Sequence, residues 1–245
     1  MTVVSRVLLL EDDASIRRFV ALALADLPIE LIEAASIADA RQVLAQQPVD
    51  LFISDLMLPD GHAMDMFRTV GDPAMRIVIF SAGISAATRE RAAELRVFRV
   101  LDKPVPYPEL IACVEQALAM PAAEAPALPL SSGADRLPAM QRQRAIDAHF
   151  GGQAALFDEF LASCLAQLPA DLEAGDRACA AHDASALRRV AHNLKSVLQL
   201  IGSTDGHAMA RRLEQGAAAG GVFAPLAFAW AEVRAHVSAL CRPGA

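Results

Sequence analysis

Five short apolar runs alternate with longer stretches of helical spacing in the first half of the chain. The runs lie at residues 7–10, 29–32, 51–53, 77–80 and 97–101. Apolar runs of this length are typical of parallel strands that are buried on both faces. Between them, apolar residues recur every three or four positions, as at Ile16, Phe19 and Val20. This alternation predicts a doubly wound α/β domain built on a five-stranded parallel sheet.

The second half of the chain has a different pattern. From residue 139 onward Ala and Leu dominate, and the segments are interrupted at Gly151-Gly152, Pro169, 182–183, 202–206 and Gly220-Gly221. Helical segments separated by short breaks predict an all-α helical bundle. Residues 122–138 are rich in Pro, Ala, Ser and Gly and have no apolar period, which indicates a linker. We therefore expect domains at residues 1–121 and 139–245, joined by this linker.

The overall composition limits the classes of partner. The formal net charge is −7, which argues against nucleic acid and membrane surfaces, because both are polyanions that attract basic proteins. The four cysteines lie far apart and form no C-x-x-C pair, so they indicate buried thiols in a reducing compartment. The N-terminal residues lack the features of a signal peptide. We expect a cytoplasmic protein without membrane attachment.

Charged and hydroxyl side chains follow four of the five predicted strands. Glu11 and Asp12 follow the first strand, Asp55 the third, Ser81 the fourth and Lys103 the fifth. The carboxyl ends of parallel strands lie at one edge of a doubly wound sheet, where such proteins bind their ligands. We therefore expect these five side chains to converge.

Three converging carboxylates repel one another and favour a hard divalent cation such as Mg²⁺. Asp55 could then act as an oxygen nucleophile toward phosphorus. Lys103 would balance charge on the phosphoryl oxygens, and the Ser81 hydroxyl could donate a hydrogen bond to one of them. The competing interpretation, that acids after strands only cap helices, fits Asp13 well. It does not account for all five positions together.

Four motifs of this half, in order, carry a family resemblance. The segments VLLLEDDASIRR, ISDLMLPDG, VIFSA and LDKPV resemble the receiver domain of two-component response regulators over residues 5–120. The resemblance implies a flavodoxin-like sheet, phosphorylation of Asp55 and a cis peptide between Lys103 and Pro104. It also implies self-catalysed phosphorylation and dephosphorylation. The Mg²⁺ ligands that it implies are Glu11, Asp12, Asp55 and the backbone carbonyl of Met57.

One position departs from the family pattern. Val100 stands three residues before the lysine, where the family often carries Tyr or Phe, whose rotamer reports phosphorylation. An aromatic switch of that kind is therefore in question here. Phe98 lies two residues earlier and points to the opposite face if this segment is a strand. We expect Phe98 to belong to the core.

A helix in the second half carries a candidate nucleophile. Asp183 is a suitable N-cap, and the apolar stripe that follows is Leu187, Val190, Ala191, Leu194, Leu198 and Ile201. His192 lies off this stripe, so its ring is expected to face solvent. The same exposed face should carry Arg188, Lys195, Ser196 and Gln199. A neutral imidazole beside protonated cations can attack phosphorus, although a histidine in such a setting is more often only part of a solvated surface.

The segments RRVAHNLKSVLQLIGS and ARRLEQGAAAG resemble a histidine phosphotransfer domain over residues 139–241. Ala191, His192, Leu194, Lys195 and Gly202 match its pattern, and Leu213 with Glu214 match on the next helix. Ser196 replaces the usual Gly, and Val197 is bulkier than many relatives carry. The resemblance implies a four-helix bundle in which His192 is phosphorylated, with Lys195 and Ser196 beside it. No kinase activity is implied, because the sequence has no nucleotide-binding motif.

The favoured function is a phosphorelay protein that carries phosphoryl groups on Asp55 and His192. Its implied partners are a sensor histidine kinase, either simple or hybrid, and other receiver domains, with no direct nucleic-acid or membrane contact. An alternative is a phosphorylation-gated module whose helical half binds a partner without being phosphorylated. A hidden enzymatic or DNA-binding output is disfavoured, because the helical half is charge-neutral and no second acid is expected near His192.

Overall fold

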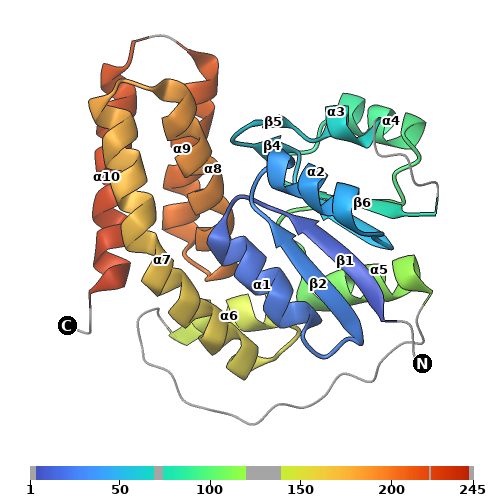
Figure 1. Ribbon diagram of the computed structural model, residues 1–245. Coiled ribbons are helices and arrows are strands. Elements are labelled where there is room, and N and C mark those ends of the chain that lie inside the picture. The colour runs from blue at the N-terminus through green and yellow to red at the C-terminus, as the bar shows by residue number, and fades with distance from the viewer. Residues whose placement is uncertain (1–3, 69–73, 120–138, 221, 243–245) are drawn as a thin grey trace. The chain divides into compact units, whose positions relative to one another are not determined.

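The computed structural model describes residues 4–68, 74–119, 139–220 and 222–242, and the chain forms two compact units, Met1–Pro126 and Ala127–Ala245 (Figure 1). We describe each unit by itself. The predicted linker at residues 122–138 lies outside the described residues.

The first unit contains the predicted parallel sheet. Its strands are β1 (Ser5–Leu10), β2 (Ile29–Ala34), β3 (Leu51–Ser54), β6 (Arg76–Ser81) and β7 (Arg99–Asp102), in the order β2-β1-β3-β6-β7. All neighbouring pairs are parallel. This is the flavodoxin-like order, in which the chain reverses its direction of strand addition between β1 and β3. The five predicted strands are confirmed, and ligands of such folds bind at that reversal point.

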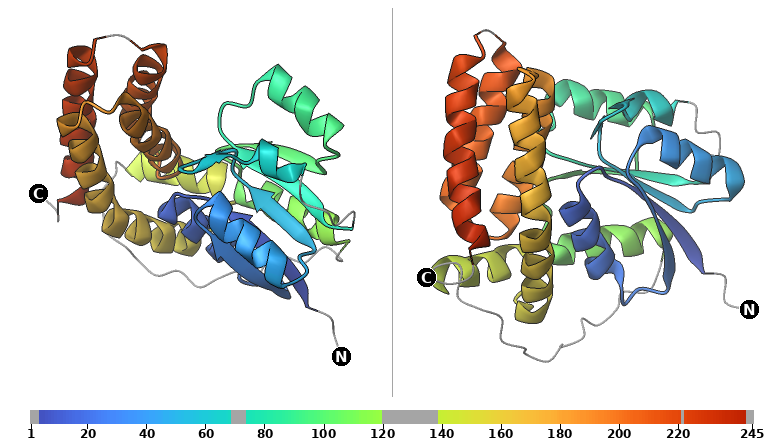
Figure 2. Two further views of the ribbon diagram at one scale, coloured as in Figure 1. Left: turned by 45° about the horizontal axis from the view of Figure 1, so that its top comes forward. Right: turned by 60° about the vertical axis from the view of Figure 1, so that its left-hand side comes forward.

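Helices cover both faces of the sheet (Figures 1 and 2). Those on one face are α1 (Ala14–Leu24) and α5 (Tyr107–Leu118), and those on the other are α2 (Ile37–Gln46), α3 (Met64–Phe67) and α4 (Ala86–Glu94). Residues 7–10 of β1 and all four residues of β3 are fully buried, because successive residues alternate between the two covered faces. The edge strands β2 and β7 are only partly buried, so the prediction of full burial is wrong for them.

The loop between β1 and α1 is short. Asp13 caps α1, and its Oδ1 accepts a hydrogen bond from the Ile16 N–H at 2.9 Å, which confirms the predicted cap. Glu11 and Asp12 therefore lie directly at the end of β1. A hairpin that the sequence did not reveal follows β3, made of β4 (Met57–Leu58) and β5 (Gly61–His62). Its two-residue strands are too short to give an apolar period.

The second unit is all-α, as predicted. Its helices are α6 (Ala139–His149), α7 (Ala154–Ala180), α8 (Ala184–Leu200), α9 (Thr204–Ala219) and α10 (Ala224–Cys241). Helix α8 packs against α7 and α9, and α10 packs against the same two helices. Helices α7 to α10 thus close into a four-helix bundle (Figure 1), and α6 packs on α8 in addition.

Pro169 does not end a helix, contrary to the predicted break. Helix α7 is 27 residues long and continues on both sides of Pro169. Proline in a helix interior removes one hydrogen bond and costs about 3 kcal/mol. Buried residues continue on both sides of it, with Leu168 before and Leu172 after. Their burial outweighs the lost hydrogen bond, because each contributes about 1.5–3 kcal/mol when removed from water.

The four cysteines, all in described segments, are free thiols. Cys113 and Cys164 are buried, whereas Cys179 and Cys241 are half-buried, so the prediction of buried thiols holds for two of them. Within the described ranges, each helix is too short or too polar to serve as a transmembrane span.

Helix α7 carries a glycine where another helix approaches closely. A Cβ on Gly175 would lie 2.1 Å from Cζ2 of Trp230 in α10. The indole is buried, and its Nε1 donates a hydrogen bond to Asp176 at 2.9 Å. The ring therefore cannot move aside without losing that hydrogen bond. Gly175 is required by packing, although its helical position would otherwise favour alanine.

We expect Gly175→Ala to lower the free energy of unfolding of the helical unit by about 1–3 kcal/mol, since it overpacks a filled interface. Urea denaturation followed by the fluorescence of Trp230, the single tryptophan, measures this. Gly216→Ala is the matched control, because its Cβ would lie 3.2 Å from the flexible Leu226 side chain. Equal stability of the two variants would contradict the packing argument.

Candidate functional sites

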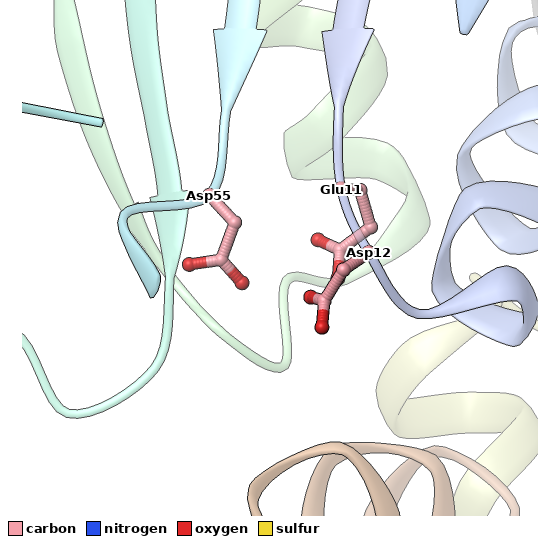
Figure 3. Close-up of side chains that lie close together, drawn as sticks. All are labelled: Glu11, Asp12 and Asp55. Atoms are coloured by element: carbon pink, nitrogen blue, oxygen red, sulfur yellow. The ribbon is translucent and has the colours of Figure 1, made fainter. Parts of the chain in front are cut away.

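Three carboxylates meet at the edge of the sheet where β1 and β3 end. Glu11 and Asp12 follow β1 and Asp55 follows β3, and Figure 3 shows the three side chains turned toward the same space. Ligand oxygens of the three lie within 4.8 Å of one another. Glu11 and Asp55 are buried, and Asp12 is half-buried. Carboxylate oxygens at this spacing suit a hard divalent cation.

Lys103 follows β7 and enters the same cluster. Its Nζ lies 2.5 Å from Asp55 Oδ2 and also hydrogen-bonds to Glu11 Oε2. Burial lowers the pKa of Lys103, but the charges of Asp55 and Glu11 outweigh it and raise that pKa. The ammonium therefore stays charged. Burial raises the pKa of Glu11 well above its ordinary value, with Lys103 opposing this and Asp55 adding to it.

The other oxygen of Asp55 is held by three donors. Oδ1 accepts hydrogen bonds from the Ser81 hydroxyl at 2.6 Å, the Leu56 N–H at 2.5 Å and the Met57 N–H at 3.2 Å. With Lys103 on Oδ2, both oxygens of Asp55 are fixed in position. Hydrogen bonds of this kind favour the charged form of a carboxylate.

The structure thus brings together all five side chains expected to converge: Glu11, Asp12, Asp55, Ser81 and Lys103. The Lys103-Pro104 peptide is cis, as expected. Met57 lies in β4 and donates its N–H to Asp55, while a role for its carbonyl stays a prediction.

Arg17 was missed as a member of this site. Its Nη1 donates a hydrogen bond to the Glu11 carbonyl at 2.6 Å, and its Nε lies 3.6 Å from Glu33. It therefore fixes the backbone that carries the two acids after β1. The signal was present, since Arg17 lies one helical turn after Asp13 and so returns toward the start of α1.

The prediction for Phe98 is wrong. Phe98 is 37% exposed, and its ring lies beneath the guanidinium groups of Arg76 and Arg99, at 4.9 and 5.9 Å. Strand β7 begins only at Arg99, so the alternation of a strand does not apply to Phe98. Val100, in contrast, lies in β7 and packs against the core on the α4 side.

His192 does not face solvent, contrary to prediction. It is 5% exposed, and its Nδ1 lies 2.6 Å from Glu214 Oε1 of α9. The prediction assumed that α8 buries only its apolar stripe, as a helix with a single neighbour would. Helix α9 packs along α8 and brings an acid to the histidine, so the expectation that no acid lies nearby is also wrong.

Glu214 joins His192 to Lys195. Its Oε2 accepts a hydrogen bond from Lys195 Nζ at 2.7 Å. Burial raises the pKa of Glu214, but hydrogen bonds from His192 and Lys195 outweigh this and lower it to about 2. An ionised carboxylate can accept a hydrogen bond from an Nδ1–H of His192, and in the neutral imidazole with that tautomer the lone pair is on Nε2. Nε2 has no hydrogen-bond partner among the residues that the structure describes.

Ser196 is also buried rather than exposed. Its hydroxyl donates a weak hydrogen bond to the His192 carbonyl one turn earlier, at 3.5 Å. Arg188 and Gln199 are half-buried. Of the four residues expected beside His192, Lys195 is the one with a described contact to the acid that holds the imidazole.

Two family models match the chain. Residues 7–115 match the response regulator receiver domain, and residues 159–241 match the Hpt domain. Neither matched region is a kinase catalytic domain.

Curated relatives are similar over part of their length. The DNA-binding transcriptional regulator NtrC of Azospirillum brasilense is 32% identical over 57% of this chain and 30% of its own length. The response regulator protein PilR of Pseudomonas aeruginosa is 28% identical over 52% of this chain and 29% of its own length. The receiver protein CpdR of Brucella abortus is 28% identical over 46% of this chain and 96% of its own length. The chain thus spans about 30% of the first two relatives.

Solved receiver domains are also similar. A CheY-like receiver domain protein from Methanospirillum hungatei is 19% identical, with a TM-score of 0.46 over 47% of this chain and 94% of that one. A receiver domain of a putative LuxO repressor from Vibrio parahaemolyticus is 25% identical, with a TM-score of 0.46 over 48% and 92%.

The lowered pKa of Glu214 predicts a pH dependence of stability. A carboxyl whose pKa falls from 4.5 to about 2 on folding stabilises the protein above pH 4.5, and loses that contribution as the pH falls toward 2. At pH 7 we expect Glu214→Gln to lower the free energy of unfolding by on the order of 2 kcal/mol. The difference from wild type should shrink at pH 3.5.

Chemical denaturation at both pH values, again followed by Trp230 fluorescence, measures this difference. Glu173→Gln is the control, because Glu173 forms only an exposed ion pair with Arg177 and such pairs contribute little. A Glu214→Gln difference that is equal at pH 7 and pH 3.5 would contradict the assignment.

Proposed function

The chain contains a response regulator receiver domain and an Hpt domain, and we propose that it is a phosphorelay protein that carries phosphoryl groups on Asp55 and His192. The observation that carries this proposal is the Asp55 carboxylate, which is fixed between Lys103 on one oxygen and Ser81 with two backbone N–H groups on the other.

Asp55 is suited to attack phosphorus. A carboxylate oxygen forms the new P–O bond, and the bond between phosphorus and the donor's leaving group breaks. Lys103 is placed to balance negative charge on the incoming phosphoryl oxygens, and the Ser81 hydroxyl can turn from Asp55 to donate to one of them. Both groups are buried, which strengthens their electrostatic effect because water is excluded.

The acids at this site fit Mg²⁺. Their donor atoms are hard oxygens, and these lie within 4.8 Å of one another. We propose Glu11, Asp12, Asp55 and the Met57 carbonyl as the residues that hold it. When bound, Mg²⁺ would supply positive charge that, together with Lys103, balances the phosphoryl oxygens.

His192 is suited to exchange a phosphoryl group with an aspartyl phosphate. Its Nε2 lone pair attacks phosphorus and the P–O bond to the aspartate breaks, which restores the carboxylate. The proton on Nδ1 stays in place, held by Glu214. In the reverse direction the P–N bond breaks and a neutral imidazole leaves, so no proton has to be gained or lost. We propose that Lys195 positions Glu214 and balances its charge.

We propose the boundaries 1–121, 122–138 and 139–245 for receiver, linker and Hpt domain, which the family matches at 7–115 and 159–241 support. The implied partners are a histidine kinase, simple or hybrid, and other receiver domains, in a cytoplasmic setting that suits four free thiols. We do not propose a nucleic-acid or membrane ligand, given the net charge of −7.

The alternative, in which the helical half binds a partner without carrying phosphate, is not favoured. It gives no reason for an ionised Glu214 to hold one ring nitrogen of His192 while Lys195 compensates its charge. A solvated surface histidine would need neither contact.

We expect the full chain, incubated with radiolabelled acetyl phosphate and Mg²⁺, to acquire a base-labile label on Asp55, because an acyl phosphate is broken by base. Asp55→Asn should abolish this label. The Asp55→Asn protein, given a separately phosphorylated receiver domain, should acquire an acid-labile label on His192, since a phosphoramidate is broken by acid. Peptide mapping by mass spectrometry locates both groups.

Asp65→Asn and His182→Gln are the matched controls, because Asp65 pairs with Arg91 in the first unit and His182 packs on Phe223 in the second. Both controls should label like wild type. Label that persists unchanged in Asp55→Asn and in His192→Gln would overturn the proposed function. Label on Asp55 without any label on His192 would leave the alternative function in its place.

A further inference from the structure

Asp60 lies at the turn of the hairpin that follows the phosphoacceptor strand, and it binds a different helix. Its Oδ1 accepts a hydrogen bond from the Ile37 N–H and its Oδ2 from the Ala38 N–H, both at 3.0 Å. These are the first two N–H groups of α2, more than twenty residues earlier in the chain. Ser36, the N-cap, accepts the N–H of Asp39 separately.

The helix therefore does not need Asp60 as its N-cap residue. Ser36 already caps α2 from within the same segment, and Asp60 adds a second cap from a distant one. A carboxylate at this end of a helix is favoured by the partial positive charge of the N–H groups. Slight burial raises the pKa of Asp60, but these hydrogen bonds outweigh it and lower that pKa.

The backbone of the residue next to Asp60 lies near the start of α2. Gly61 has a φ of +147°, and a Cβ there would lie 3.4 Å from Cδ1 of Ile37. The hairpin is closed at its base by a hydrogen bond from the Ala63 N–H to the Leu56 carbonyl, at 3.0 Å. Asp60 thus holds the turn against α2, and the hydrogen bond between Ala63 and Leu56 closes the base of the hairpin.

This hairpin carries part of the Asp55 site. Leu56 and Met57 donate their N–H groups to Asp55 Oδ1, and Leu56 also accepts the hydrogen bond that closes the hairpin. Any movement of the turn therefore shifts the backbone that orients the Asp55 carboxylate and carries the Met57 carbonyl.

We propose that Asp60 is a positioning residue for the Mg²⁺ and phosphoryl site: by clamping the hairpin at Met57–His62 to the start of α2, it holds the Leu56–Met57 backbone in the geometry that the site requires. The inference rests on the proposed function, because it names a residue that prepares the same site. Asp60 acts through the backbone and does not itself contact Asp55 in any described hydrogen bond.

The test is a Mg²⁺ titration of the full chain, isotopically labelled and followed by the NMR shifts of backbone amides, for wild type, Asp60→Ala and Asp60→Asn. We expect Asp60→Ala to weaken Mg²⁺ binding about tenfold, the lower end of the range for residues that support metal ligands. Asp60→Asn keeps one acceptor oxygen and should lie between Asp60→Ala and wild type. The Mg²⁺ concentration that half-saturates phosphorylation by acetyl phosphate should shift in parallel.

Ser36→Ala is the matched control, because it removes a cap from the same helix but leaves the clamp intact. It should lower the thermal stability while changing Mg²⁺ affinity less than about twofold. Equal Mg²⁺ affinity in Asp60→Ala and wild type, or equal weakening in Asp60→Ala and Ser36→Ala, would overturn the inference. If either of these results occurs while Asp55 of the wild type is labelled normally, the inference about Asp60 fails but the proposed function stands. If the wild type binds no Mg²⁺, both the inference and the proposed function are overturned.

Discussion

The receiver unit depends on the balance of charge at one edge of its sheet. The reversal of strand order between β1 and β3 brings the carboxylates of Glu11, Asp12 and Asp55 together. Two unit charges about 4 Å apart near a protein surface interact with about 4 kcal/mol, which is a large part of the 5–15 kcal/mol that stabilises a typical domain. The buried Lys103 offsets part of this repulsion. The remaining negative charge favours a bound cation.

The helical unit also balances charge around its proposed nucleophile, but there an acid contacts the nucleophile and a lysine contacts the acid. Its proposed nucleophile is an imidazole, and the acid beside it orients the ring through a contact at Nδ1. Glu214 accepts from His192 on one oxygen and from Lys195 on the other. In the receiver, the lysine binds the proposed nucleophile directly; in the helical unit, the lysine binds the residue that orients the proposed nucleophile. Both arrangements fix the orientation of the proposed nucleophile through contacts between charged side chains.

The sequence predicted the central features of the receiver because they follow from local patterns. Strand ends in a parallel sheet share one edge, so five positions were enough to place Asp55, Ser81 and Lys103 together. The sequence did not predict features that depend on contacts with a second helix or with a distant segment. The apolar stripe of α8 does not reveal that α9 brings Glu214 to His192. Pro169 in the sequence predicts a helix end, because the burial of residues on both sides of it, which lets α7 continue, is a property of the folded protein. Phe98 was predicted to be buried because the strand was expected to include it, whereas β7 begins one residue later. The clamp of Asp60 on α2 joins two segments that are distant in the sequence, and no local apolar period reveals such a contact.

We propose Asp55 as the one carboxylate prepared to take a phosphoryl group, with a divalent cation beside it. Beryllofluoride bound to a carboxylate has the tetrahedral shape and charge of a phosphoryl group, and it gives a ¹⁹F NMR signal distinct from free fluoride. We expect one bound complex per chain in wild type, formed only when Mg²⁺ is present and lost in Asp55→Asn. A wild-type chain without the bound signal at saturating Mg²⁺, or an Asp55→Asn chain that retains it, would contradict this role of Asp55.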